Sequence, residues 1–247
     1  MSVLVEVVCF SIEDVYRAKE GGAGRVELCA DPGAGGTTPS YGLIKASVAL
    51  GIQTAVMIRP RGGDFYYTPE EIAVMEEDIR IAAKLGAEAV VFGVLDADGA
   101  LDSKTMSRLA QLSKSHGLEI TCHRAFDVAG DPKRALQVLL DLEFDRLLTS
   151  GQQKTALEGM PLLKELIQES AGRISIMPGG GVRPKNVSEL LQLDITEIHT
   201  GSKTKVPSRL KKRGSEIKIG ADDAQESHYF VDTEAIKQIV AACQGRR

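Results

Sequence analysis

The run RVELC at residues 25–29 follows a first β-type run, VLVEVVC at residues 3–9, and a short helical stretch, and this order sets the pattern of the whole chain. Each β-type run stops at a cluster of polar or glycine residues, and most are followed by a helical stretch. The further runs are TAVMIRPRGG (54–63), EAVVFG (88–93), EITCHRAFD (119–127), RLLTSG (146–151), ISIMPGGG (174–181) and EIHTG (197–201). Strands that alternate with helices predict a parallel sheet, and eight such units in 247 residues predict a TIM (β/α)8 barrel.

Composition supports one domain over residues 1–247. With 43% hydrophobic residues the chain can bury one large core, and no linker divides it. The net charge of −4 is spread along the chain, tryptophan is absent and aromatic residues make up 4%, so nucleic acid is not an expected partner. We expect no membrane span and no signal peptide, because the apolar runs are only strand-sized and the chain enters a strand directly. Four dispersed cysteines are expected to be free thiols, which fits a cytoplasmic protein.

Helix starts are marked by Ser11, Thr68 and Asp131, whose side-chain oxygens can cap a first turn, and Arg183-Pro184 is expected to start a further helix. Between residues 201 and 232 both periodicities fail, and basic residues crowd positions 203–213. We expect a long excursion after the eighth strand, closed by a helix over residues 233–243. The basic segment is expected to be a solvated loop, with an interaction surface as the alternative.

Two glutamates are predicted to point into the barrel. Alternation along the strands places Arg25, Glu27 and Cys29 on one face of the second strand and directs Glu6 inward from the first. Two carboxylates in a largely dry core need arginine partners. A structural network with Arg25 or Arg59 is one interpretation, and a catalytic or ligand role for the carboxylates is the other.

The chemistry of a TIM barrel sits at the C-terminal ends of its strands. The residues predicted there are Arg59, Arg61, His123, Arg124, Asp127, Ser150, Gly179, Gly180, Gly181 and His199. Arg59 and Arg61 flank a proline, and their guanidinium groups suit bidentate contact with carboxylate or phosphate. The alternative is that one arginine pairs with Glu27 and the other with Asp64.

A glycine loop strengthens the prediction of an anion site. Gly179, Gly180 and Gly181 follow the seventh strand, where barrel enzymes often bind phosphate through backbone N–H groups. A tight loop that requires positive φ is the alternative explanation. Ser150, at the end of the sixth strand, could add a hydroxyl donor to the same ligand.

His123 and His199 each end a strand, where a histidine can act as acid, base or metal ligand, although a lone histidine is more often a hydrogen-bonded structural residue. No HxxxH, HxH or CxxC spacing is present, so local spacing does not predict a zinc site. The chain also has no nucleophile-elbow serine, no GxxxxGK[ST] and no GxGxxG before a helix, which disfavours serine hydrolases, nucleotide triphosphatases and dinucleotide enzymes.

In combination, six motifs resemble the CutC copper homeostasis proteins. They are RVELC (25–29), GGTTPS (35–40), RPRGGDF (59–65), HRAFD (123–127), LTSG (148–151) and PGGG (178–181). The resemblance implies a cytoplasmic TIM barrel that forms a homo-oligomer and takes part in copper handling, with copper(I) as a possible ligand. It implies no established reaction.

This chain departs from the family pattern at the proposed copper ligands. Family members proposed to bind copper(I) carry a cysteine two residues after the first-strand glutamate, where this chain has Val8 and the thiol is at Cys9. A shift of one residue reverses the face of a strand. Cys29 matches the second family cysteine, and copper(I) normally needs at least two sulfur or nitrogen ligands, so Cys9 could assist only from a bulged strand. After His199, a threonine and a glycine replace the two serines that the family tends to have.

Two functions therefore remain open. The first is copper(I) binding or trafficking through Cys29, with Cys9 as a conceivable second ligand. The other is an uncharacterised barrel enzyme or sensor for a small anionic metabolite. Its anion would bind Arg59, Arg61, Ser150 and the glycine loop, and Glu27 or His123 would transfer protons. The residue pattern favours the anion site, and the family name favours copper.

Overall fold

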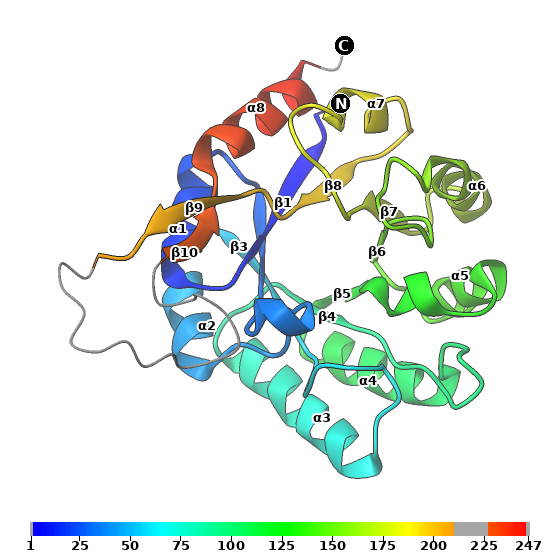
Figure 1. Ribbon diagram of the computed structural model, residues 1–247. Helices are drawn as coiled ribbons and strands as arrows, with labels where there is room; N and C mark the ends of the chain where they lie inside the picture. Colours follow the sequence, from blue (N-terminus) through cyan, green and yellow to red (C-terminus); the bar gives the residue numbers. More distant parts are fainter. Residues whose placement is uncertain (1, 210–226, 246–247) are drawn as a thin grey trace.

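The computed structural model describes residues 2–209 and 227–245 and confirms the TIM barrel (Figure 1). Eight strands form one sheet in the order β7-β6-β5-β4-β3-β2-β1-β8, and every pairing in it is parallel. The strands are β1 (Leu4–Cys9), β2 (Arg25–Leu28), β3 (Gln53–Met57), β4 (Ala89–Phe92), β5 (Glu119–Cys122), β6 (Arg146–Thr149), β7 (Ser175–Pro178) and β8 (Glu197–Thr200). The two ends of the order, β7 and β8, lie side by side, and the hydroxyls of Ser175 and Thr196 are 3.1 Å apart across this seam.

Helices surround the strands on the outside of the ring (Figure 1). They are α1 (Ile12–Glu20), α2 (Tyr41–Val48), α3 (Pro69–Lys84), α4 (Ser103–Ser115), α5 (Pro132–Asp141), α6 (Met160–Ser170), α7 (Val187–Leu190) and α8 (Thr233–Gln244), with 3₁₀ helices η1 (Pro32–Ala34) and η2 (Arg124–Val128). Ser11, Thr68 and Asp131 cap α1, α3 and α5 as expected. The expected start at Arg183-Pro184 is about three residues early: a turn begins there, in which the N–H of Val187 donates to the Arg183 carbonyl at 3.0 Å, and α7 begins at Val187 without a side-chain cap. None of the described helices is long and apolar enough to cross a bilayer.

Part of the excursion after β8 is a hairpin and not the expected loop. β9 (Lys203–Pro207) pairs antiparallel with β10 (Ser227–Val231), and residues 210–213 of the basic segment lie outside the described part of the chain. The hairpin is tied to α1, because the backbone N–H of Val231 donates to Asp14 Oδ1 at 2.8 Å and Arg17 lies over the ring of Phe230 at 5.1 Å. The partner of β9 is distant in sequence, so local periodicity could not reveal the pairing.

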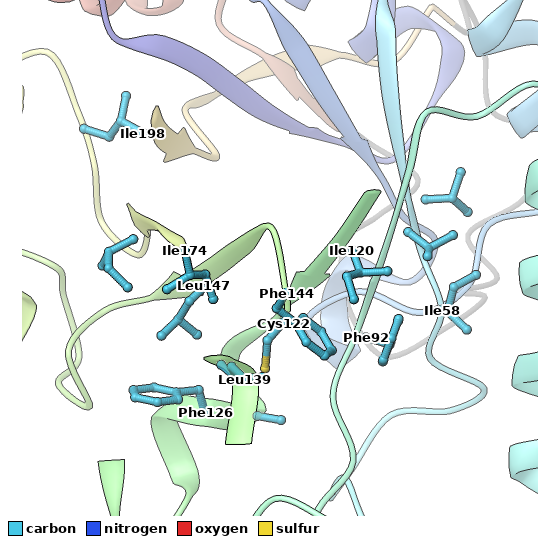
Figure 2. Close-up of a cluster of buried hydrophobic side chains, with 14 of the residues drawn as sticks. Ile58, Phe92, Ile120, Cys122, Phe126, Leu139, Phe144, Leu147, Ile174 and Ile198 are labelled. Carbon is cyan, nitrogen blue, oxygen red and sulfur yellow. The ribbon is translucent and has the colours of Figure 1, made fainter. Parts of the chain in front are cut away.

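Apolar side chains form two separate cores. The larger core lies between the strands and the helices, and Figure 2 shows the part of it around Phe92, Cys122, Phe126, Leu139 and Phe144. The smaller cluster lies inside the barrel. It consists of Cys29, Ala55, Met57, Ala89 and Val91. Because the inner side chains of β3 and β4 are mostly small, the interior has room for charged side chains from the other strands.

Candidate functional site

Ionised side chains of alternating sign cross the lower interior of the barrel. Arg25 Nε donates to Glu6 Oε2 at 2.5 Å, and Arg25 Nη2 donates to Glu197 Oε2 at 2.6 Å. Arg146 extends this row of ion pairs, since its Nε donates to Glu197 at 2.8 Å and its Nη2 pairs with Glu119. Arg25 holds the pKa of the buried Glu6 at about 2 against the effect of burial, and His199 assists it. The structural network expected for Glu6 is therefore confirmed, with Arg25 as its partner.

Glu27 has no arginine partner among the described ion pairs. Its Oε2 accepts a hydrogen bond from the Cys29 thiol at 3.7 Å and lies 3.9 Å from His199 Nε2, whereas its buried Oε1 makes no hydrogen bond with any described residue. Burial raises the pKa of Glu27 to about 7, the charge of Glu6 adds to this rise, and His199 opposes it. Of the alternative pairings considered for Arg59 and Arg61, the one with Glu27 is wrong, whereas Arg61 does pair with Asp64. The carboxyl is held in a setting in which it can take up or release a proton near neutral pH.

His199 connects the two glutamates. Its Nδ1 lies 2.8 Å from Glu6 Oε1, which fixes the ring and turns Nε2 toward Glu27. Burial opposes the charge of the ring, but the hydrogen bond that His199 donates to Glu6 and the negative charges of both glutamates outweigh burial and raise the pKa of His199. The titrations of Glu27 and His199 are therefore coupled: when one of the two groups holds a proton, the other loses its proton more readily.

His123 lies at the end of β5, where it caps η2 and packs against Phe65 with ring centroids 4.9 Å apart. Its Nδ1 accepts the backbone N–H of Ala125 at 3.2 Å, so the ring proton sits on Nε2. Burial and the charge of Arg59 lower the pKa of His123 to about 3. The ring is neutral at physiological pH and offers an N–H donor, so it does not fit the role of a general base.

Arg59 is 5% exposed; within the described residues its two Nη atoms donate to carbonyl oxygens, and its buried Nε has no partner. Nη1 donates to Ala34 and Gly36 at 2.6 and 2.9 Å, and Nη2 donates to Gly63 at 2.8 Å. The group also lies over the ring of Phe65, 4.8 Å from its centroid. Arg59 thus organises the loops after β2 and β3 and places a positive charge beside the cavity described below.

Two residues expected in the anion site are used elsewhere. The side chain of Arg61 is 39% exposed, and Arg61 pairs with Glu71 at 2.6 Å and with Asp64 at 3.0 Å, outside the cavity. Ser150 is fully buried and does not line the cavity; its hydroxyl binds Asp127 and Gln153 and accepts from Arg124 at 2.8 Å. Ser150 therefore positions Arg124 and is not itself directed at a ligand.

The glycine loop after β7 serves more than one purpose. Gly179 has an ordinary φ, but a Cβ there would collide with Leu148 and press on His199, so the residue is required for close packing. Gly180 and Gly181 have φ of +98° and +73°, which favours glycine, and both line the cavity. Their backbone N–H groups donate to no protein atom in the described part of the chain.

A cavity of about 250 Å³ lies at the C-terminal mouth of the barrel. Its lining includes the polar side chains of Glu27, Arg59, His123, Arg124, Arg183 and His199. Glu27 is the sole acidic residue in this lining, so the cavity carries net positive charge. Sequence reasoning missed Arg183, which was interpreted as a helix start. It placed His199 at the rim as a possible acid, base or metal ligand but did not connect it with Glu6 or Glu27. The alternation that placed Glu6 inward could have placed His199 beside it, because the two are register partners on β1 and β8.

The two cysteines predicted as copper ligands do not face each other. The register of β1 against β2 is regular from Glu6 to Cys9, so the strand has no bulge. Cys9 belongs to the outer core and Cys29 to the inner cluster, so they point to opposite faces of the sheet. Burial and nearby carboxylates also raise the pKa of both thiols well above the ordinary value. The proposed Cys9–Cys29 pair is therefore wrong.

One cluster of potential ligand atoms does occur among the described residues: Glu6, Glu27 and His199 each place one within 4.8 Å of the others. Glu6, however, already uses Oε2 for Arg25 and Oε1 for His199. A carboxylate and imidazole set also suits borderline or hard ions better than copper(I). These residues do not fit a copper(I) centre.

The fold and the charged mouth define a TIM-barrel protein with a candidate small-molecule site at its C-terminal rim. The model of the CutC family matches residues 3–204, and the chain belongs to that family. A Mus musculus relative named copper homeostasis protein cutC homolog is 44% identical over 236 residues, which cover 95% of this chain and 86% of the relative. A CutC family protein of Parabacteroides distasonis is 43% identical over 240 residues, with 96% and 98% covered. The crystal structure of CutC from Streptococcus agalactiae matches with a TM-score of 0.75 and 36% identity over 80% of this chain and 97% of that chain.

Proposed function

We propose that the protein binds a small anionic metabolite, a phosphate or a carboxylate, in the mouth of the barrel, as an enzyme or a sensor. The observation that carries this proposal is that Arg59 is buried without a described carboxylate partner. Its guanidinium is buried beside the cavity, and no carboxylate pairs with it within residues 2–209 and 227–245. A buried charge without a counter-ion is unfavourable, and a bound anion would supply that counter-ion.

Other groups around the cavity complement the same ligand. Arg124 and Arg183 add guanidinium groups to the lining, and the backbone N–H groups of Gly180 and Gly181 are available as donors. Bare N–H groups and arginine forks are the donors that proteins use for phosphate. The cavity volume of about 250 Å³ lies just below the range of about 300–1,000 Å³ for drug-sized ligands, which favours a small metabolite.

Inorganic phosphate provides the direct test. We expect the protein to bind phosphate at low ionic strength, and we expect Arg183→Gln to weaken binding about 10- to 100-fold, the effect of losing one charge-assisted hydrogen bond. Isothermal titration calorimetry measures this. The matched control is Lys185→Gln. Lys185 lies two positions after Arg183 and carries the same charge, but its side chain is not part of the cavity lining. Equal weakening by both substitutions would show only a general field effect, and no binding by wild type would remove the proposal.

The family adds a biological setting to this proposal. Because relatives are named copper homeostasis proteins, we propose that the protein takes part in copper homeostasis through the ligand of this cavity. Cys9, Cys29 and Cys122 are buried free thiols, which supports a reducing compartment such as the cytoplasm. Assembly into a homo-oligomer stays a prediction from the resemblance.

Direct copper(I) binding is a second candidate, because relatives are named copper homeostasis proteins and the motif resemblance implies a copper(I) role for the cysteine at position 29. Against it, the pKa of the buried Cys29 thiol is strongly raised, which disfavours the thiolate that copper(I) binds. We expect anaerobic copper(I) titration with a competing chelator to give equally weak binding for wild type and Cys29→Ala. Cys122→Ala, which removes a thiol from the outer core, is the control. Tight binding that Cys29→Ala alone abolishes would establish copper(I) as a ligand.

A further inference from the structure

Three buried polar atoms of residues that line the cavity have no hydrogen-bond partner among the described residues. They are Glu27 Oε1, Arg59 Nε and His123 Nε2. Glu27 lies on β2, whereas Arg59 and His123 follow the ends of β3 and β5. Buried polar atoms in native proteins are nearly always bonded, so exceptions that line a cavity indicate where a ligand supplies the missing partner.

Glu27 Oε1 and His123 Nε2 differ in chemical role. Because His123 Nδ1 accepts the N–H of Ala125, Nε2 carries a hydrogen and can only donate. Glu27 has the opposite character. Its Oε2 faces the Cys29 thiol and His199, so Oε1 is the oxygen that remains to accept a proton from a ligand. The cavity therefore presents a carboxylate base on one strand and a neutral imidazole donor on another.

Resting on the proposed anion site, we infer that the protein catalyses proton transfer at a carbon next to a carbonyl group, on a small phosphorylated hydroxycarbonyl compound. The phosphate would occupy the arginine and glycine side of the mouth. The carbonyl oxygen would accept the hydrogen bond of His123 Nε2, and the carbon-bound hydrogen would face Glu27 Oε1. A carboxylate base together with a neutral imidazole is an arrangement suited to this chemistry.

The step balances without any further reactant. Glu27 Oε1 takes the proton, the electrons of the broken C–H bond form a C=C bond, and the carbonyl π electrons move to the oxygen. The negative charge that develops on this oxygen is stabilised by the N–H of His123 and by the nearby Arg59 charge. Return of the proton to the neighbouring carbon, while the hydroxyl proton of the first carbon passes to the former carbonyl oxygen, moves the carbonyl group to the first carbon. Return of the proton to the opposite face of the first carbon inverts a stereocentre there, and neither outcome needs an oxidant or reductant.

The remaining neighbours of Glu27 hold it in place for this role. Glu6 on β1 fixes the His199 ring through Nδ1, and His199 on β8 stands 3.9 Å from the second oxygen of Glu27. Arg25 is engaged by Glu6 and Glu197, and its charge lowers the pKa of Glu27 only as the smallest of the influences on that carboxyl. Glu27 thus has no arginine partner among the described ion pairs and can gain and lose a proton, with Oε2 facing Cys29 and His199.

Solvent exchange tests the inference. Dihydroxyacetone phosphate and glycolaldehyde phosphate are incubated with the protein in D₂O, and loss of the carbon-bound proton signal is followed by proton NMR. We expect wild type to accelerate exchange, Glu27→Gln to reduce the acceleration at least about 100-fold, and His123→Gln to reduce it about 100- to 1,000-fold. Glu143→Gln, an exposed glutamate in the turn between α5 and β6, should exchange as wild type does.

Phosphate binding, measured on the same samples, separates two kinds of failure. Exchange that depends on Glu27, in a variant that still binds phosphate, supports the inference. Phosphate binding by wild type with no Glu27-dependent exchange of either compound overturns the inference and leaves the anion site standing. Absence of phosphate binding removes both.

Discussion

Replacing Arg25 with methionine is expected to lower the free energy of unfolding by about 3–5 kcal/mol at neutral pH, the usual loss when one member of a buried ion pair is removed. Arg25 is 2% exposed and is the cation shared by Glu6 and Glu197. Methionine fills a similar volume but leaves these carboxylates inside the barrel without the Arg25 cation. Arg146 still neutralises Glu197, so most of the loss falls on Glu6. Equilibrium unfolding in urea, followed by circular dichroism, measures the change.

The matched control for this prediction is Arg108→Met. Arg108 pairs with Glu76, but its side chain is 61% exposed, so the same substitution should change the unfolding free energy by at most about 1 kcal/mol. Adding Glu6→Gln to Arg25→Met should recover part of the loss, because the unpaired carboxylate is then gone. A loss at Arg25 no larger than that at Arg108 would contradict a buried network as the support of the barrel interior.

The barrel itself could be predicted because its signals are local. Each strand is a short apolar run, and caps such as Ser11 and Thr68 depend on residues only three positions away. The hairpin of β9 and β10 was missed for the opposite reason. Lys203 pairs with Val231, and this contact depends on a partner that no local periodicity marks.

The inward direction of Glu6 and Glu27 could be predicted because alternation on a strand is a strict geometric rule. Which arginine pairs with which glutamate could not be predicted, because the pairing depends on how neighbouring strands are staggered around the ring. The register places Glu6 opposite Arg25 and opposite His199, so Glu6 gains both partners and Glu27 gains no arginine.

The sequence predicted which residues lie at the strand ends that form the rim. In the structure, only some of these residues direct their side chains into the cavity. Arg59 and Arg61 are two residues apart, yet Arg59 is buried beside the cavity and Arg61 turns outward to Glu71. Arg183 was missed because a proline follows it, which is typical of a helix start. Sequence gives the position of a residue along the rim, whereas loop packing decides whether its side chain reaches the cavity.

Replacing Glu27 with glutamine is expected to stabilise the protein at about pH 8, by about 1–3 kcal/mol. Burial raises the pKa of Glu27 from 4.5 to about 7, and each unit corresponds to about 1.4 kcal/mol. A carboxyl whose pKa is higher in the folded state favours folding fully below its unfolded pKa and loses this contribution as the pH rises through its folded pKa. Above pH 7 wild type therefore holds an unfavourable buried charge that glutamine does not carry. The pairing of Glu27 with His199 offsets part of this charge, so the gain falls below the full shift.

The same measurement at about pH 4 should show almost no difference between wild type and Glu27→Gln, because the wild-type carboxyl is then already protonated in the folded state. Glu6→Gln provides the control of opposite sign. The pKa of Glu6 is lowered to about 2, so its charge stabilises the fold above pH 4.5, and its loss should destabilise the protein at pH 8 and much less at pH 2. Destabilisation by Glu27→Gln at pH 8 would mean that Glu27 is a structural member of the network. Stabilisation together with lost proton exchange would mean that the fold tolerates an unfavourable carboxylate at this position for the sake of activity.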